Sequence, residues 1–312
     1  MVHISFNFNL FNSYYYFYER LLVLLFSLVP SLLLVGFVLY TDRKSKEPSK
    51  NIVICVLSGT LTVALAGYLE QLVMPYFSSN IILTYVWAMI EELCKLSVFF
   101  LFIFDNKYYD DIYDGIVYMS LIALSFAGLE NIMYAFSEST INNSISLALM
   151  RDFTTIPLHV ICGIVIGFFA SLGNFSKDKN KKYFNFLLAI LIPTIIHGTF
   201  NSLMNFLGSI NTTNVSSIVI LFTQALPLIL IMVVLFAIAI YTSKKTIDLN
   251  KVFIEDGTYD KKYDYLMTYG DYINSSDMKK RNDMYNKTKL NIKNKKNTNH
   301  KEDLVNYKFD NK

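Results

Sequence analysis

The side chains best suited to chemistry lie within long apolar stretches of this sequence. Two adjacent glutamates and a lysine, Glu91, Glu92 and Lys95, stand in the stretch Met89-Ile-Glu-Glu-Leu-Cys-Lys95. Comparable stretches contain Glu130, Asn131, His159, His197 and Asn201. An ionisable group at the centre of a membrane helix costs about 2.5–3.5 kcal/mol on the insertion scale. Each ionisable residue of this set therefore needs a partner or has a function.

Helical spacing brings some of these residues together. Lys95 follows Glu91 by four residues and Glu92 by three, so all three share one helix face and the lysine can neutralise one carboxylate. His197 and Asn201 are also four residues apart. From that position the Asn201 amide can orient a water, a substrate carbonyl or an oxyanion.

Two kinds of hydrolytic chemistry suit such carboxylates and imidazoles. Adjacent carboxylates beside a lysine titrate as a coupled set, and a glutamate beside an imidazole can deprotonate a water and later protonate a leaving amine. Two histidines and several glutamates can instead hold a Zn²⁺ ion with one position open for water. Intramembrane Glu and His also form proton or cation pathways, so a proton- or ion-coupled transporter is the alternative function.

Other polar residues have structural interpretations. Asn131 suits a hydrogen bond between helices, and His159 could serve helix packing in the same way. Arg151 and Asp152 stand at the end of a predicted span and are typical of a membrane interface.

The elements that must position the candidate residues are membrane-spanning helices. The chain has 312 residues, of which 53% are hydrophobic and 17% are charged, whereas soluble domains contain about 25% charged residues. Apolar stretches of roughly 20 residues match the thickness of a bilayer, and helices satisfy their backbone groups in lipid. Seven spans are predicted, at 21–40, 52–68, 81–104, 115–136, 153–172, 183–207 and 216–241. The predicted fold is an all-α polytopic membrane helix bundle, with residues 1–242 as its multi-pass membrane domain.

Basic residues indicate the orientation of this bundle. Loops 41–50 and 173–182 contain four Lys or Arg residues each, whereas loops 69–80 and 208–215 contain none. The positive-inside rule then predicts an integral membrane protein whose N-terminus is outside and whose C-terminus is cytoplasmic. The Asn- and Lys-rich tail suggests a low-GC genome, and hence the plasma membrane of a bacterium.

The candidate residues lie at a similar depth in the membrane. In this orientation Glu91, Glu130, His159 and His197 all lie roughly 9–15 Å below the outer surface, at about 1.5 Å per helical residue. Polar groups that face one another cost less than polar groups that face lipid. We therefore expect four helices to bring these residues into one buried cluster.

The remainder of the chain excludes some functions. Residues 243–312 are polar and rich in Asn and Lys, which predicts a disordered cytoplasmic tail. The basic excess is small and mixed with acids, which argues against nucleic-acid binding. The cysteines, Cys55, Cys94 and Cys162, are widely spaced within apolar stretches and indicate neither a metal pair nor a disulfide framework.

Several protease and transporter signatures are missing from the sequence. It contains no HExxH zinc motif, no serine in a Gly-x-Ser-x setting that pairs with a helix histidine, and no pair of aspartates within two spans. Nor does it contain the inverted repeats with broken helices that transporters often show. A hydrolase built on these spans would have to use glutamate and histidine.

Four motifs occur on four successive predicted spans. Glu91-Glu92-Leu93-Cys94-Lys95 forms an EExxK signature, and Asp114-Gly115-Ile116-Val117-Tyr118 precedes Phe126-Ala127-Gly128-Leu129-Glu130-Asn131. Pro157-Leu158-His159 with Gly163, and then His197-Gly198-Thr199-Phe200-Asn201, complete the set. Over residues 85–205 the chain resembles the PrsW family of intramembrane proteases. That family is related to the prenyl-protein (CAAX) endopeptidases and to bacteriocin-processing proteins.

The resemblance implies an intramembrane endopeptidase that cuts membrane-anchored protein substrates, as in the first, extracytoplasmic cleavage of an anti-sigma factor. A catalytically inactive immunity or receptor-like member is a further alternative, which the intact Glu and His residues disfavour. The resemblance leaves open whether a metal such as Zn²⁺ takes part.

The resemblance also implies residue roles. Glu91 or Glu92 would be the general base, while His159 and His197 would position water or a metal. Asn201 would bind the oxyanion. Lys95 and Glu130 would support these residues. The candidate metal ligands are Glu130, His159 and His197.

Overall fold

The computed structural model describes residues 16–42, 47–77, 79–106, 108–109, 112–176 and 178–209. Within them the protein is helical, with one short 3₁₀ helix and no strand. The elements are α1 (Phe17–Thr41), α2 (Ser49–Val73), η1 (Met74–Tyr76), α3 (Asn80–Phe102), α4 (Ile112–Ser137), α5 (Ile141–Phe153), α6 (Thr155–Phe175) and α7 (Lys179–Ser209). The predicted all-α class is confirmed for this part of the chain. The predicted seventh span, 216–241, and the predicted tail, 243–312, lie outside the described residues.

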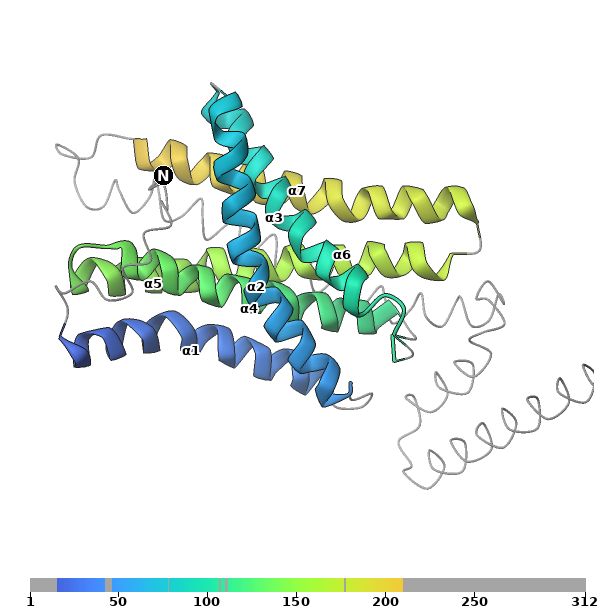
Figure 1. The fold of residues 1–312 in the computed structure, drawn as a ribbon, viewed down its shortest axis with the longest axis horizontal. Helices are drawn as coiled ribbons and strands as arrows, with labels where there is room; N and C mark the ends of the chain where they lie inside the picture. Colours follow the sequence, from blue (N-terminus) through green and yellow to red (C-terminus); the bar gives the residue numbers. More distant parts are fainter. Residues whose placement is uncertain are drawn as a thin grey trace, which may run out of the picture.

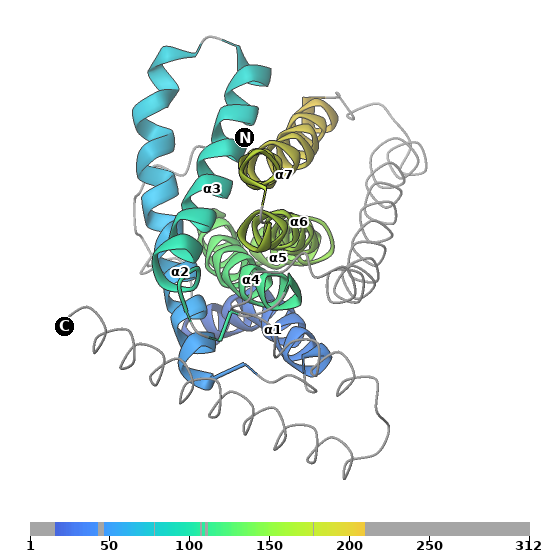
Figure 2. The same cartoon turned by 90° about the vertical axis from the view of Figure 1, so that its right-hand side faces the viewer.

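The helices form a layer that is crossed by a helical hairpin. α1, α4, α6 and α7 have nearly parallel axes, and α2 and α3 cross them at a steep angle (Figure 1). Viewed from the end, the four helices stack in a row with α2 and α3 along one side (Figure 2). α4 packs against α1, α2 and α6, while α3 packs against α7 and α4. This crossing brings one face of α3 close to several helices of the layer.

Five stretches are long and apolar enough to cross a membrane: Phe17–Thr41, Ser49–Tyr76, Ile112–Ser137, Ile141–Phe175 and Lys179–Phe206. Each of the first six predicted spans coincides with a helix, but α3 is not among these five. Every 18-residue window of α3 contains the three charged residues Glu91, Glu92 and Lys95, and this charge content separates α3 from the five apolar stretches. These three side chains are buried, so the protein itself shields them from lipid.

The segment predicted as a loop, 137–152, contains the helix α5 instead. The hydroxyl of Thr140 caps α5 by accepting a hydrogen bond from the backbone N–H of Asn143. Ser144, Ala148 and Arg151 are buried on one face at helical spacing. Span prediction missed this helix because it is amphipathic and shorter than a membrane crossing.

Glycines on α6 allow α4 and α6 to pack closely. A Cβ atom on Gly163 would lie 2.8 Å from the carbonyl oxygen of Met119, and one on Gly167 would collide with the backbone of Gly115. Two glycines four residues apart are a common solution for close helix contact in membranes, where van der Waals packing drives association. The close approach brings polar residues further along the two helices within hydrogen-bonding distance.

A buried polar network joins the start of α2 to the second turn of α4. We call Glu47, Asn51, Asn106 and Tyr118 the tyrosine network. The Tyr118 hydroxyl donates a hydrogen bond to Glu47 Oε2 and accepts one from Asn51 Nδ2 at 2.8 Å. Asn106 Nδ2 in turn donates to Asn51 Oδ1 at 3.0 Å. Tyr118, the last residue of the Asp-Gly-x-x-Tyr motif, thus holds these helices together.

Candidate active site

One face of α3 provides two carboxylates and an ammonium group. Lys95 Nζ lies 2.9 Å from Glu92 Oε1 and 3.6 Å from Glu91 Oε2. The ammonium also lies over the ring of Phe126 from α4, 4.2 Å from its centroid. The predicted sharing of one helix face is confirmed, and the lysine contacts both carboxylates.

His197 comes from α7, which lies close to α3 at this point. A Cβ on the next residue, Gly198, would collide with the ring of Tyr85 on α3. This close approach lets His197 Nδ1 lie 2.7 Å from Glu92 Oε1 and Nε2 lie 3.9 Å from Glu91 Oε2. The imidazole therefore lies beside both carboxylates and contacts Glu92 through one nitrogen.

His159 of α6 extends the contacts toward α4. Its Nδ1 lies 3.0 Å from Lys95 Nζ, and its Nε2 lies 3.0 Å from Glu130 Oε2. Because a lysine ammonium only donates hydrogen bonds, we assign the lone pair to Nδ1 and the proton to Nε2, which donates to Glu130. The rings of His159 and His197 are perpendicular, with centroids 4.9 Å apart.

Arg151 is a member of this site that the sequence interpretation placed at a membrane interface. Its Nη2 atom lies 2.8 Å from Glu130 Oε2, and its side chain is 10% exposed. The guanidinium also lies over the ring of Tyr134, 4.0 Å from the centroid. Recognition of α5 would have found Arg151, since it shares the buried face of Ser144 and Ala148.

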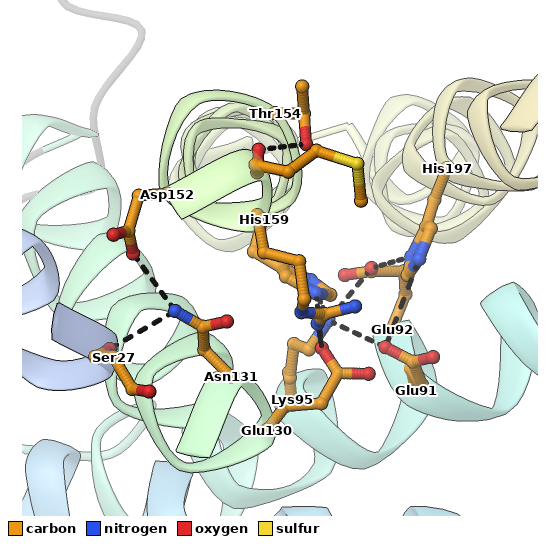
Figure 3. A network of polar contacts seen from close by, with 12 residues as sticks. Ser27, Glu91, Glu92, Lys95, Glu130, Asn131, Asp152, Thr154, His159 and His197 are labelled. Atoms are coloured by element: carbon orange, nitrogen blue, oxygen red, sulfur yellow. Dashed lines mark hydrogen bonds and ion pairs between the residues drawn. The ribbon is translucent and has the colours of Figure 1, made fainter. Parts of the chain in front are cut away.

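Asn131 bonds to residues outside this group of glutamates, histidines, Lys95 and Arg151, and links helices instead. Its Nδ2 atom donates to the backbone oxygen of Ser27 at 3.2 Å and to Asp152 Oδ1 at 2.9 Å. Figure 3 shows this link beside the larger group of charged side chains. The interpretation of Asn131 as an interhelical hydrogen-bonding residue is confirmed.

The expected buried cluster forms from α3, α4, α5, α6 and α7. We call its members the ionic cluster: Glu91, Glu92, Lys95, Glu130, Arg151, His159 and His197. The labelled members of α3 and the two histidines converge between their helices in Figure 3. Glu91 Oε2 and Glu92 Oε2 are buried and accept no hydrogen bond. The cluster thus retains hydrogen-bonding capacity among its carboxylates.

A cavity of about 370 Å³ adjoins the ionic cluster. Its walls include Glu91, Glu130, Arg151, His197 and Asn201, whereas Glu92 and His159 do not line it. Asn201 lies one helical turn beyond His197 and is half-buried. The cavity is large enough for a ligand or for several waters. Glu91 and His197 are therefore the cluster members of α3 and α7 that face open space.

The cavity also includes Glu70, which the sequence interpretation did not select. The predicted second span ended at residue 68, but α2 continues through Val73 and carries Glu70 to the cavity wall. The prediction relied on hydropathy, which falls at a glutamate even when the helix continues. A helix-based reading of the whole segment would have placed Glu70 on α2.

The donors that lie closest together form a candidate metal centre. One ligand atom each from Glu91, Glu92, His159 and His197 lies within 4.8 Å of the others. Glu130 of the predicted set is not among these four; its Oε2 atom contacts Arg151 and His159. Two carboxylates and two imidazoles fit Zn²⁺ by type, although the Lys95 ammonium already contacts three of the four residues.

Comparisons with known proteins agree with this architecture. Residues 47–239 match the model of the family described as PrsW family intramembrane metalloprotease. Protease PrsW of Clostridioides difficile (strain 630) is 30% identical over 191 residues, which are 59% of this chain and 80% of the relative. Protease PrsW of Oceanobacillus iheyensis is 30% identical over 202 residues, or 64% of this chain and 90% of the relative. No solved structure matches significantly.

The apolar helices and these relatives together define a multi-pass integral membrane peptidase. The chain belongs to the PrsW family of intramembrane metalloproteases, because the family match covers more than half of its length. The matches cover 80% and 90% of the lengths of these two relatives. The resemblance inferred from four motifs is thus confirmed, and the similarity extends beyond residues 85–205 on both sides.

Proposed function

We propose that the ionic cluster activates a water molecule to hydrolyse a peptide bond of a membrane-anchored protein. The observation that carries this proposal is the position of Glu91, whose carboxylate faces the cavity beside His197 while its Oε2 atom accepts no hydrogen bond. A carboxylate that is buried, lines a cavity and retains a vacant acceptor is suited to hold and deprotonate water.

Glu91 is assigned the role of general base and acid. It removes a proton from water, the resulting hydroxide oxygen attacks the carbonyl carbon of the substrate, and the C–N bond breaks. The proton on Glu91 then passes to the leaving amine, so the carboxylate is regenerated. Glu92 lies deeper and contacts both Lys95 and His197. Its proposed role is to orient these two groups.

His197 is proposed to position the water. When Nδ1–H donates to Glu92, the lone pair of Nε2 points away from that contact and can accept a hydrogen bond from water. Asn201, from the same helix and cavity, is proposed to donate its amide N–H to the developing oxyanion. Preorganised donors of this kind typically contribute about 10²–10³ in rate.

The remaining cluster residues are proposed to keep the carboxylates in place. Arg151 and His159 both contact Glu130, and His159 also contacts Lys95. These three hydrogen bonds connect α5 with α3 by way of α4 and α6. Glu91, Glu92, His159 and His197 would hold a divalent metal. When bound, such a metal supplies a hydroxide at neutral pH and polarises the scissile carbonyl.

The proposed substrates are single-span membrane proteins cut near the outer membrane boundary, as in regulated proteolysis of an anti-sigma factor. Glu130 lies seven residues before the end of α4, or roughly 10 Å along the helix. We propose an N-terminus outside, a cytoplasmic C-terminus and a polar tail at 243–312 beyond the membrane domain 1–242. A cysteine at Thr213, in the predicted last outer loop, would then react with an impermeant thiol reagent.

The test is a proteomic comparison of cells that express the wild type with cells that express the double variant Glu91→Gln, Glu92→Gln. We expect a small set of single-span proteins to acquire new N-termini near the outer boundary only with the wild type. Glu19→Gln serves as the control, because Glu19 lies outside the cavity. Identical N-termini in both strains, with normally inserted protein, would refute the proposed peptidase and favour a transporter or an inactive family member.

Metal involvement is tested on the purified protein. Metal content measured by mass spectrometry should fall in His159→Ala and in the double glutamate variant if these residues hold a metal. An equal, substoichiometric metal content in all variants would assign the chemistry to glutamate and histidine alone.

A further inference from the structure

Glu70 brings a carboxylate into the catalytic cavity from a helix that contributes nothing to the ionic cluster. It lies one turn before the end of α2 and lines the same cavity as Glu91 and Glu130. It is also within electrostatic range of both carboxylates. Glu70 therefore faces the space in which the substrate of the proposed reaction would lie.

Unlike the other two carboxylates, Glu70 has no counter-charge in contact with it. Glu130 Oε2 lies 2.8 Å from Arg151 Nη2, and Glu91 Oε2 lies 3.6 Å from Lys95 Nζ. Among the residues that the structure describes, the carboxylate of Glu70 makes no hydrogen bond and no ion pair. A half-buried carboxylate in a membrane helix is costly without such a partner. Its position thus points to a partner that arrives with the ligand.

The charged residues of the cavity wall indicate whether that partner is a cation or an anion. Four glutamates line the cavity, and Arg151 is the one Lys or Arg among its described lining residues. Arg151 is already bound to Glu130. The vacant Oε2 atom of Glu91 is already assigned to the catalytic water, which leaves the Glu70 carboxylate to receive a charged group of the ligand. A cationic group with several N–H donors would satisfy both the charge and the acceptor oxygens of Glu70, and charge interactions strengthen in a low-dielectric site.

Resting on the proposed peptidase function, we propose that Glu70 is a specificity-determining residue that binds a lysine or arginine side chain of the substrate. The basic residue would lie within about three residues of the scissile bond, because an extended peptide advances about 3.4 Å per residue and Glu70 shares one cavity with Glu91. The preferred substrates are accordingly membrane proteins with a basic residue beside the cleavage site.

The test uses single-span reporter proteins with a randomised ten-residue segment at the outer membrane boundary. Reporters are expressed with the wild type, and cleaved molecules are identified by N-terminal sequencing. We expect Lys or Arg to be enriched at one fixed position relative to the cut. Replacing that residue by Glu should slow cleavage at least tenfold. Glu70→Lys should invert the order, so that the reporter with Glu is cleaved faster than the reporter with Lys.

Two further variants separate charge from fold. Glu70→Gln keeps the size of the side chain and should remove the preference without abolishing cleavage. Glu138→Gln removes another carboxylate from the cavity wall, beyond the last residue of α4, and should leave the ranking of reporters unchanged. Retention of the wild-type ranking in Glu70→Gln and Glu70→Lys, or equal loss of it in Glu138→Gln, would overturn the assignment to Glu70. Cleavage of no reporter by the wild type would instead refute the peptidase function itself.

Discussion

The ionic cluster and the tyrosine network are both buried and polar, and both join helices that are distant in the sequence. Tyr118 and Glu130 are 12 positions apart on α4, which separates the two groups by roughly 18 Å along the helix. In the tyrosine network, the Tyr118 hydroxyl both donates and accepts, and the Asn51 amide does the same. In the ionic cluster, the buried oxygens Glu91 Oε2 and Glu92 Oε2 remain without hydrogen bonds, and one side of the cluster faces a cavity.

Buried polar residues on the one helix α4 therefore serve two different purposes. A network in which donors and acceptors meet one another fixes the positions of helices, because each broken contact would leave an unpaired polar group. A cluster that retains vacant acceptors beside a cavity can bind and activate a ligand, at a cost in stability. Substitutions in the first region should therefore alter stability, and substitutions in the second should alter activity, except where a buried charge loses its partner.

The largest effect is expected where a buried charge loses its partner, at Lys95. Lys95→Met removes the ammonium that lies between Glu91, Glu92 and His159. Breaking a buried ion pair by removal of one partner typically costs about 3–5 kcal/mol, because the remaining charge is left uncompensated. We expect a loss of this size in the free energy of unfolding, measured in detergent micelles by denaturant titration.

A second substitution sharpens this result. The double variant Lys95→Met, Glu92→Gln removes a negative charge together with the positive one and should recover much of the lost stability. If Lys95→Met alone is as stable as the wild type, charge compensation is not the role of Lys95, and the distinction between the two regions would have to be redrawn.

Arg151 tests whether the periphery of the ionic cluster acts on the chemistry. Arg151→Met leaves His159 as the hydrogen-bond partner of Glu130 Oε2 and should loosen the series of contacts that leads to Lys95. By analogy with outer-sphere residues of metal sites, we expect kcat for reporter cleavage to fall about 10–100-fold with little change in KM. Arg151→Lys keeps the charge and should restore part of the rate. A fall in stability with unchanged kcat would make Arg151 a structural residue.

The sequence predicted the helical fold well because hydropathy and helix length are local properties. Each of the first six predicted spans coincides with a helix. The errors occurred where polarity and helicity coincide: α5 was taken for a loop, and α2 was ended before Glu70. In these segments Arg151 and Glu70 face the cavity inside the protein, and hydropathy alone cannot distinguish this from exposure to water.

The membership of the site was predictable for a different reason. Charged residues inside apolar stretches must find one another, so Glu91, Glu130, His159 and His197 could be assigned to one cluster before any contact was known. The order of the contacts could not be derived, because it depends on where α3 crosses α4, α6 and α7. For this reason the expected metal ligand Glu130 contacts Arg151 and His159 and is absent from the closest donor group.

The smallest expected effect belongs to the tyrosine network and tests the other half of the comparison. Tyr118→Phe removes one hydroxyl and leaves Asn51 Nδ2 without its acceptor and Glu47 Oε2 without this donor. An unsatisfied buried group costs about 1–3 kcal/mol, so the melting temperature in detergent should fall while the cleavage rate per folded molecule stays at the wild-type value.

Asn51→Ala is the matched variant from the other side of the same hydrogen bond. If the two losses are additive, the bond does not couple them; if the double variant loses little more than either single one, the network acts as a unit. A fall in the cleavage rate of folded Tyr118→Phe would show that the network transmits its geometry along α4 to Glu130, and the separation between scaffold and site would no longer hold.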